Sequence, residues 1–133
     1  MSITSQQSLR TSFLDWYKKG VFSSTLKRHH VFERSAISLM DTFHDAGDVS
    51  SPAVNDIYIG VMQSSPIKVR CNIGAGFFSD NLVPGSFFIC PAFYASQVDV
   101  SGPHFIRFLT IPAKLAQQLS AVSDHHDYIV LHA

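Results

Sequence analysis

Seven histidines are the residues in this sequence that first raise the possibility of a metal site. His29-His30 and His125-His126 are adjacent pairs, and adjacent side chains point to opposite sides of a strand or splay by about 100° on a helix. Neither pair therefore makes a natural chelate. His44 and His104 are isolated in the sequence. We predict ordinary surface or partly buried histidines, with no metal and no cofactor.

Nucleophilic catalysis has no local signature in the chain. Serine, histidine and aspartate are all present, but there is no nucleophile elbow, glycine-rich phosphate loop or pair of carboxylates in an apolar setting. Cys71 and Cys90 lie in apolar stretches without an adjacent base, which predicts buried, reduced thiols of low reactivity. These patterns favour a binding module over an enzyme, and no catalytic residue is assigned.

A ligand pocket is the more specific hypothesis. A small β-barrel encloses one small molecule when its inward side chains leave room, and polar side chains then orient that molecule. The polar or amphipathic candidates on probable strands are Tyr58, Arg70, Tyr94, Gln97, His104 and Arg107. Either arginine would hold an anion through bidentate hydrogen bonds if it faced inward, although solvated arginines on the outer face are the commoner case. A one-residue shift in register would invert every such assignment.

A series of short strands has to position these side chains. Residues 56–62 are β-branched and aromatic, and Gly60 predicts a bulge or a close approach of another chain segment. Residues 67–73 alternate cleanly between apolar and polar side chains. Further strands are predicted within 31–43, 86–90, 94–100 and 105–111, with turns at Asp80-Asn81 and Pro84-Gly85. Short strands punctuated this regularly are typical of a sandwich or barrel.

Short helices are predicted on both sides of the strands. Ser12 and Asp15 resemble a capping box at the start of an amphipathic helix at about 12–19. Pro112 suits an early helical position, and Leu115 and Leu119 give a helix at about 112–121 one apolar face. Residues 128–131 predict a last strand. We expect a single domain over residues 1–133, with its barrel at about 31–111.

Composition excludes several functional classes. Hydrophobic residues make up 46% of the 133 residues and charged residues 15%, a profile typical of a folded globule. Ten basic side chains balance ten acidic ones, so no net field attracts nucleic acid or a membrane surface. The polar N-terminus lacks the regions of a signal peptide, and no apolar run approaches the ~20 residues that span a bilayer. The default prediction is a cytoplasmic location.

Two stretches resemble a known family. Residues 82–92, with Gly85 followed six residues later by Pro91, resemble the central signature of cupin-like barrels. Residues 101–112, running into Leu115 and Leu119, resemble the end of the barrel in the N-terminal sensing domains of AraC-type transcriptional regulators. The resemblance covers roughly residues 55–120 and rests on the order and spacing of the elements. It implies a mainly β fold, a cupin-like small barrel (double-stranded jelly roll) with short flanking helices.

The same resemblance implies a function. It predicts a domain that binds a small-molecule effector and forms a homodimer, with Leu115 and Leu119 as candidate interface residues. The helix-turn-helix units of such regulators have no counterpart in these residues, so no direct nucleic-acid binding is expected. Two alternatives stay open: a small isomerase-like cupin enzyme, and a stand-alone barrel that binds a carbohydrate or a protein partner.

The sequence departs from metal-dependent cupins at their ligand positions. Those proteins carry two histidines one residue apart on an early strand, a downstream glutamate and a third histidine after the proline motif. No two histidines here are spaced by one residue, and Ser96 stands five residues past Pro91, where the third histidine would fall. The resemblance therefore argues against the metal-dependent cupin enzymes.

Overall fold

The computed structural model describes residues 11–123, with side chains described as far as Leu119. The predicted strand at 128–131 and the pair His125-His126 lie outside the described residues. No helix among the residues described is long and apolar enough to cross a membrane.

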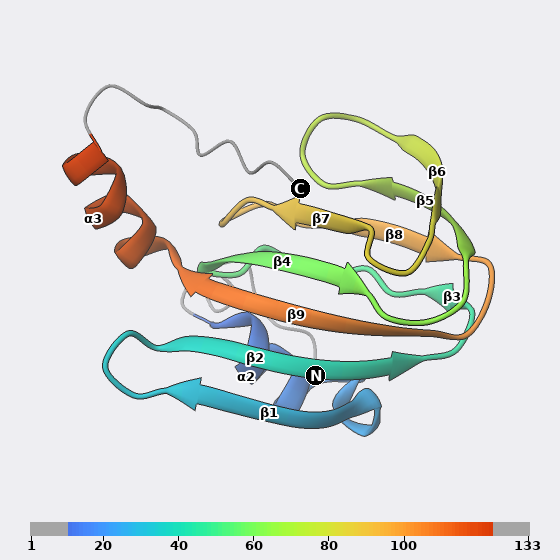
Figure 1. Ribbon diagram of the computed structural model, residues 1–133, viewed down its shortest axis with the longest axis horizontal. Coiled ribbons are helices and arrows are strands. Elements are labelled where there is room, and N and C mark those ends of the chain that lie inside the picture. The colour runs from blue at the N-terminus through green and yellow to red at the C-terminus, as the bar shows by residue number, and fades with distance from the viewer. Residues whose placement is uncertain (1–10, 124–133) are drawn as a thin grey trace.

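Two antiparallel sheets form the body of the molecule (Figure 1). The five-stranded sheet has the order β1-β2-β9-β4-β7, and the four-stranded sheet has the order β3-β8-β5-β6. The strands of the first sheet are β1 (Leu26–Phe32), β2 (Ile37–His44), β4 (Asp56–Met62), β7 (Phe87–Cys90) and β9 (His104–Pro112). The strands of the second are β3 (Gly47–Asp48), β5 (Ile67–Asn72), β6 (Phe78–Leu82) and β8 (Gln97–Val100). The predicted mainly β class is confirmed.

The alternation of side chains assigns the inner face of each sheet. Every second residue of β4 and β9 is buried, beginning with Asp56 and His104. Ile67, Val69 and Cys71 of β5 are likewise buried, while Lys68 and Arg70 are exposed. The period of two predicted from residues 67–73 is therefore confirmed, and the core lies between the two sheets.

Gly60 confirms the predicted close approach. A methyl group built on this residue would overlap the ring of Phe88 and press on the ring of Phe108. Gly60 pairs with both residues across the sheet, with Phe88 on β7 and Phe108 on β9. Glycine leaves the space that these two inward rings fill.

Two predictions about local structure were wrong. Asp80 and Asn81 do not form a turn: they lie within β6, opposite Val69 and Lys68 of β5. Pro112 does not begin the last helix, because it still pairs with Asp56 as the final residue of β9. In both places the partner strand determines the conformation, and local turn or helix preferences are overridden.

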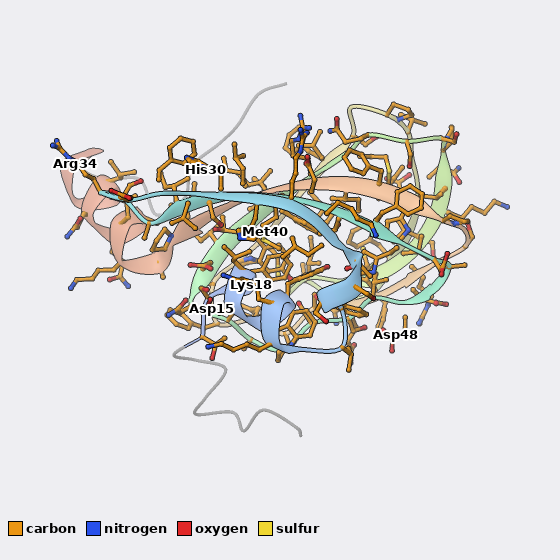
Figure 2. All side chains as sticks on the ribbon, turned by 90° about the horizontal axis from the view of Figure 1, so that it is seen from below. Asp15, Lys18, His30, Arg34, Met40 and Asp48 are labelled. Carbon is orange, nitrogen blue, oxygen red and sulfur yellow. The ribbon has the colours of Figure 1, made fainter. Side chains whose placement is uncertain are left out.

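Within residues 11–123, three short helical segments accompany the sheets: α2 (Phe13–Lys19), a 3-10 turn (Ser23–Thr25) and α3 (Ala113–Ser123). Helix α2 begins as predicted, with the Ser12 hydroxyl accepting a hydrogen bond from the Asp15 backbone N–H. Figure 2 shows α2 on the same side of the five-stranded sheet as Met40, with His30 on the opposite side. Helix α3 projects beyond the end of β9 (Figure 1).

Candidate functional site: a cavity between the sheets

An apolar cavity of about 130 Å³ lies between the two sheets. Its walls combine side chains from β4, β5, β6, β7, β8 and β9 with two aromatic rings of α2, those of Phe13 and Tyr17. The sequence folds this way because the inward residues of both sheets are mostly aliphatic or aromatic. A space of this size suits a molecule of about one six-membered ring, since an engineered cavity of about 150 Å³ holds benzene.

The exposed part of the lining lies on β6 and β7, each of which is an edge strand of its sheet. Of the described lining residues, only Phe78, Asp80 and Phe87 are exposed, and all three belong to these edge strands. Asp80 shares the inward face of β6 because it pairs with the buried Val69. It is the one charged side chain among the described residues that line the cavity.

A pair of histidines forms one polar part of the lining. His44 and His104 are cross-strand neighbours on β2 and β9, and their rings stack with centroids 5.4 Å apart. The Tyr17 hydroxyl lies 2.9 Å from Nε2 of His44, so α2 contributes to this cluster. Burial lowers the pKa of His44 to about 4, with a further contribution from His104 beside it. Burial also lowers the pKa of His104, so both rings are neutral at pH 7.

Three hydroxyl groups form a second polar part of the lining. The Ser51 hydroxyl lies 3.0 Å from the Tyr58 hydroxyl and 2.8 Å from that of Ser96. The Ser51 backbone N–H also donates to the Ser96 hydroxyl. Burial raises the pKa of Tyr58 well above its usual range. Ser51 therefore links the other two hydroxyl groups into one hydrogen-bonded cluster.

The six sequence-based candidates divide into two groups. Tyr58 and His104 line the cavity. Arg70, Tyr94, Gln97 and Arg107 do not: each lies outside the lining. The guanidinium of Arg70 lies 4.1 Å from the centre of the Phe77 ring, and Tyr94 is 52% exposed. Gln97 is exposed as well.

Arg107 is engaged on the outer face of the five-stranded sheet. Its Nε donates to Oδ1 of Asp41 at 2.8 Å, and Arg28 donates to Oδ2 of the same carboxylate at 2.7 Å. These two arginines hold the pKa of Asp41 below its usual value. Arg107 is therefore a partner of Asp41 and does not face a ligand in the cavity.

Sequence reasoning missed Tyr17, His44, Ser51 and Ser96 as lining residues. His44 follows Phe43 in the sequence with no motif around it, and only its pairing with His104 places it at the cavity. The inward alternation of residues 38–44 was the one usable signal. Tyr17 comes from a helix, so no strand pattern could have found it.

No described group meets the needs of a metal site or a reactive thiol. Among residues 11–123, no cluster of three or more His, Cys, Asp or Glu side chains has a geometry that could hold a metal ion. Cys71 and Cys90 are free and buried, and burial raises the pKa of both thiols. Raised pKa values make thiolates scarce at neutral pH.

Comparison with known proteins gives matches by structure alone. No family model and no curated protein sequence matches the chain. The Schizosaccharomyces pombe Cnp3 cupin domain superposes with a TM-score of 0.52 at 16% identity, covering 75% of this chain and 72% of that one. The plu4264 protein of Photorhabdus luminescens gives 0.51 at 10% identity, covering 75% and 87% of the two chains. A putative ethanolamine utilization protein Q from Salmonella typhimurium gives 0.50 at 14% identity, covering 64% and 67%.

Sequence identities of 16% or less are too low to infer an activity, so these matches are evidence for the fold alone. The matched regions span most of both partners, so the matches describe the arrangement of strands over most of this chain. The chain therefore has the cupin fold.

Proposed function

We propose that this chain is a small-molecule binding module, the effector-sensing and dimerising domain of an AraC-type transcriptional regulator. The observation that carries the binding role is the apolar cavity of about 130 Å³, whose exposed lining residues lie on β6 and β7. Pockets that are mostly apolar and contain a few fixed polar groups are the usual form of small-molecule sites. A binding role accords with the buried, protonated thiols of Cys71 and Cys90, which are poor nucleophiles.

The regulator assignment is supported by the way the last strand ends. Residues 101–112 resemble the end of the barrel in AraC-type sensing domains, and here β9 passes through Pro112 directly into α3. The reading frame that encodes the chain provides the test. A helix-turn-helix region in the same polypeptide would support the assignment, whereas a stop codon directly after Ala133 would contradict it.

Binding is tested with toluene as the probe, because its ring matches the cavity. We expect toluene at millimolar concentration to shift the amide resonances of Val98 and Val100 and to raise the melting temperature. Amides on the outer surface of β1, such as that of His30, serve as an internal control and stay unchanged. If neither toluene nor benzene perturbs the lining residues, the binding role is wrong.

A second copy of the chain is the partner proposed for the outer face of the five-stranded sheet. Leu39, Leu109, Ile59 and Ile89 are directly paired across β2, β9, β4 and β7, so they form one apolar row on that face. An antiparallel sheet with a free outer face ordinarily carries polar side chains there. Two identical faces related by a two-fold axis would bury the row against itself, as isologous dimers do.

Light scattering measures this association. We expect a dimer at ~100 μM that Ile59→Lys converts to monomer, because the new charge lies in the centre of the row. Asn81→Lys on the exposed strand β6 is the matched control and leaves the dimer intact. Leu119→Lys tests the interface predicted on α3, where Leu119 is 52% exposed. A monomeric wild-type protein contradicts dimerisation, and a dimer disrupted only by Leu119→Lys places the interface on α3 instead.

A further inference from the structure

One buried nitrogen in the cavity lining has no partner. Nδ1 of His104 lies 3.1 Å from the carbonyl oxygen of Gly102. A carbonyl only accepts hydrogen bonds, so Nδ1 carries the proton of the neutral ring. Nε2 is then a bare acceptor, and it has no hydrogen-bond partner among residues 11–123.

Such an acceptor is unusual in a protein interior. His104 is 1% exposed, and its ring stacks on that of His44. Most buried polar atoms are paired, because an unpaired one has lost its hydration without replacement. His44 differs in this respect, since its Nε2 already has the Tyr17 hydroxyl as a partner. His104, a residue of the cavity lining, thus carries the one buried side-chain N or O atom without a hydrogen-bond partner among the described residues.

The rest of the cavity restricts what could supply the missing donor. Phe13 and Tyr58 stack with ring centroids 3.9 Å apart, and the ring of Phe108 meets Phe13 edge-on at 5.0 Å. Aromatic surroundings of this kind favour an aromatic guest packed edge-to-face or offset. An anion is disfavoured because Asp80, the charged residue in the described lining, is itself negative.

We propose that the cavity selects a small phenol, whose ring fills the apolar space while its hydroxyl donates a hydrogen bond to Nε2 of His104. This ligand class rests on the proposed binding function and names the chemistry that the same cavity recognises. The hydroxyl supplies one donor for one acceptor, and the ring has the size that about 130 Å³ allows. We expect entry beside Phe78 and Phe87, two of the exposed lining residues.

The test compares phenol with toluene, which has the same ring and no donor. Dissociation constants for both are measured by NMR titration of the wild-type protein and of His104→Phe. We expect the preference for phenol over toluene to fall about tenfold in the variant, the effect of losing one buried hydrogen bond. His30→Phe is the matched control, because it makes the same substitution at an exposed residue of β1 that does not line the cavity.

A measurement on the wild-type protein keeps the proposal testable if His104→Phe does not fold. The ¹⁵N resonance of His104 Nε2 reports on hydrogen bonds that this atom accepts. We expect phenol to shift the resonance and toluene to leave it in place.

The outcomes separate the ligand class from the binding function. If both compounds bind but the preference is unchanged in His104→Phe and the Nε2 resonance does not respond to phenol, the phenol proposal is overturned while the binding function stands. If neither compound binds the wild-type protein, the binding function fails and the ligand class fails with it.

Discussion

The role assigned to Arg107 depends on which face of β9 its side chain occupies. Its guanidinium binds Asp41, a carboxylate that is 6% exposed although it lies on the outer face of the sheet. Arg28 covers the same carboxylate from β1. The two arginines both pair with the buried Asp41 carboxylate, and such pairing allows a carboxylate to remain charged when it is buried.

Replacing Arg107 with methionine separates this structural role from ligand binding. We expect Arg107→Met to lower the free energy of unfolding by about 1 kcal/mol, because Asp41 loses one of its two cationic partners. The affinity for phenol or toluene should be unchanged, since Arg107 lies outside the cavity. Chemical denaturation measures the free energy of unfolding, and NMR titration measures the affinity for phenol or toluene. Weaker binding in a fully folded variant would contradict the placement of Arg107.

His44 predicts a pH dependence of stability. Its pKa is about 4 in the folded protein and 6.5 in a free side chain. Between pH 4 and pH 6.5, His44 is protonated in the unfolded chain and neutral in the folded one. The free energy of unfolding therefore falls as the pH drops from 6.5 to 4. Above pH 6.5 both states are neutral and the effect vanishes.

His44→Gln isolates this contribution. Glutamine does not titrate and can still bond the Tyr17 hydroxyl. We expect the variant to lose less stability than the wild-type protein between pH 7 and pH 5, measured by denaturation in urea at each pH. His104 and the carboxylates titrate in both proteins and cancel in the comparison. Equal losses in the two proteins would show that His44 does not titrate as the structure implies.

At the scale of elements, α2 acts as a wall of the cavity. It has only seven residues, too few to be stable alone, so packing must hold it in place. Phe13, Leu14, Trp16 and Tyr17 are all buried. The Asp56 carboxylate of β4 also accepts a hydrogen bond from the Phe13 backbone N–H at 2.8 Å, which anchors the first turn to the sheet.

A pair of variants at Asp56 tests this anchor. Asp56→Leu leaves the Phe13 N–H buried without an acceptor, and we expect a loss of about 1–3 kcal/mol in the free energy of unfolding. Asp56→Asn keeps an oxygen in the same place and should cost clearly less. Urea denaturation of both variants gives the comparison. Similar losses would mean that α2 is held by its aromatic packing alone.

At the scale of the whole molecule, the space between the sheets reduces stability. The side chains that line a cavity in a protein core lack some of the van der Waals contacts that close packing would give them. Val98 of β8 lines the cavity and is half-buried, so a slightly larger side chain there can use the space.

Val98→Ile adds one methylene while keeping the β-branched shape that suits a strand. We expect it to raise the free energy of unfolding by about 0.8 kcal/mol and to weaken toluene binding several-fold, because the added group occupies the site. Thermal denaturation and NMR titration measure both. Val31→Ile, on the exposed strand β1, is the control and should change neither. Stabilisation without weaker binding would place toluene elsewhere.

The sequence by itself determined the mainly β fold, the bounds of β4 and α2, and the inward face of β5. Each of these depends on local pattern: alternation with a period of two, a serine cap, and β-branched residues between turn signals. It also placed Tyr58 and His104 among six candidate site residues, because both are polar or amphipathic side chains on probable strands.

Only the tertiary structure decided the rest of the site. Asp80-Asn81 has the composition of a turn, yet pairing with β5 makes it part of a strand. His44 and His104 are sixty residues apart in the sequence, and only the register of β2 with β9 brings their rings together. Tyr17 reaches the same cluster from a helix outside both sheets. Local composition carries no information about which strand becomes the neighbour, and that neighbour decides which side chains meet.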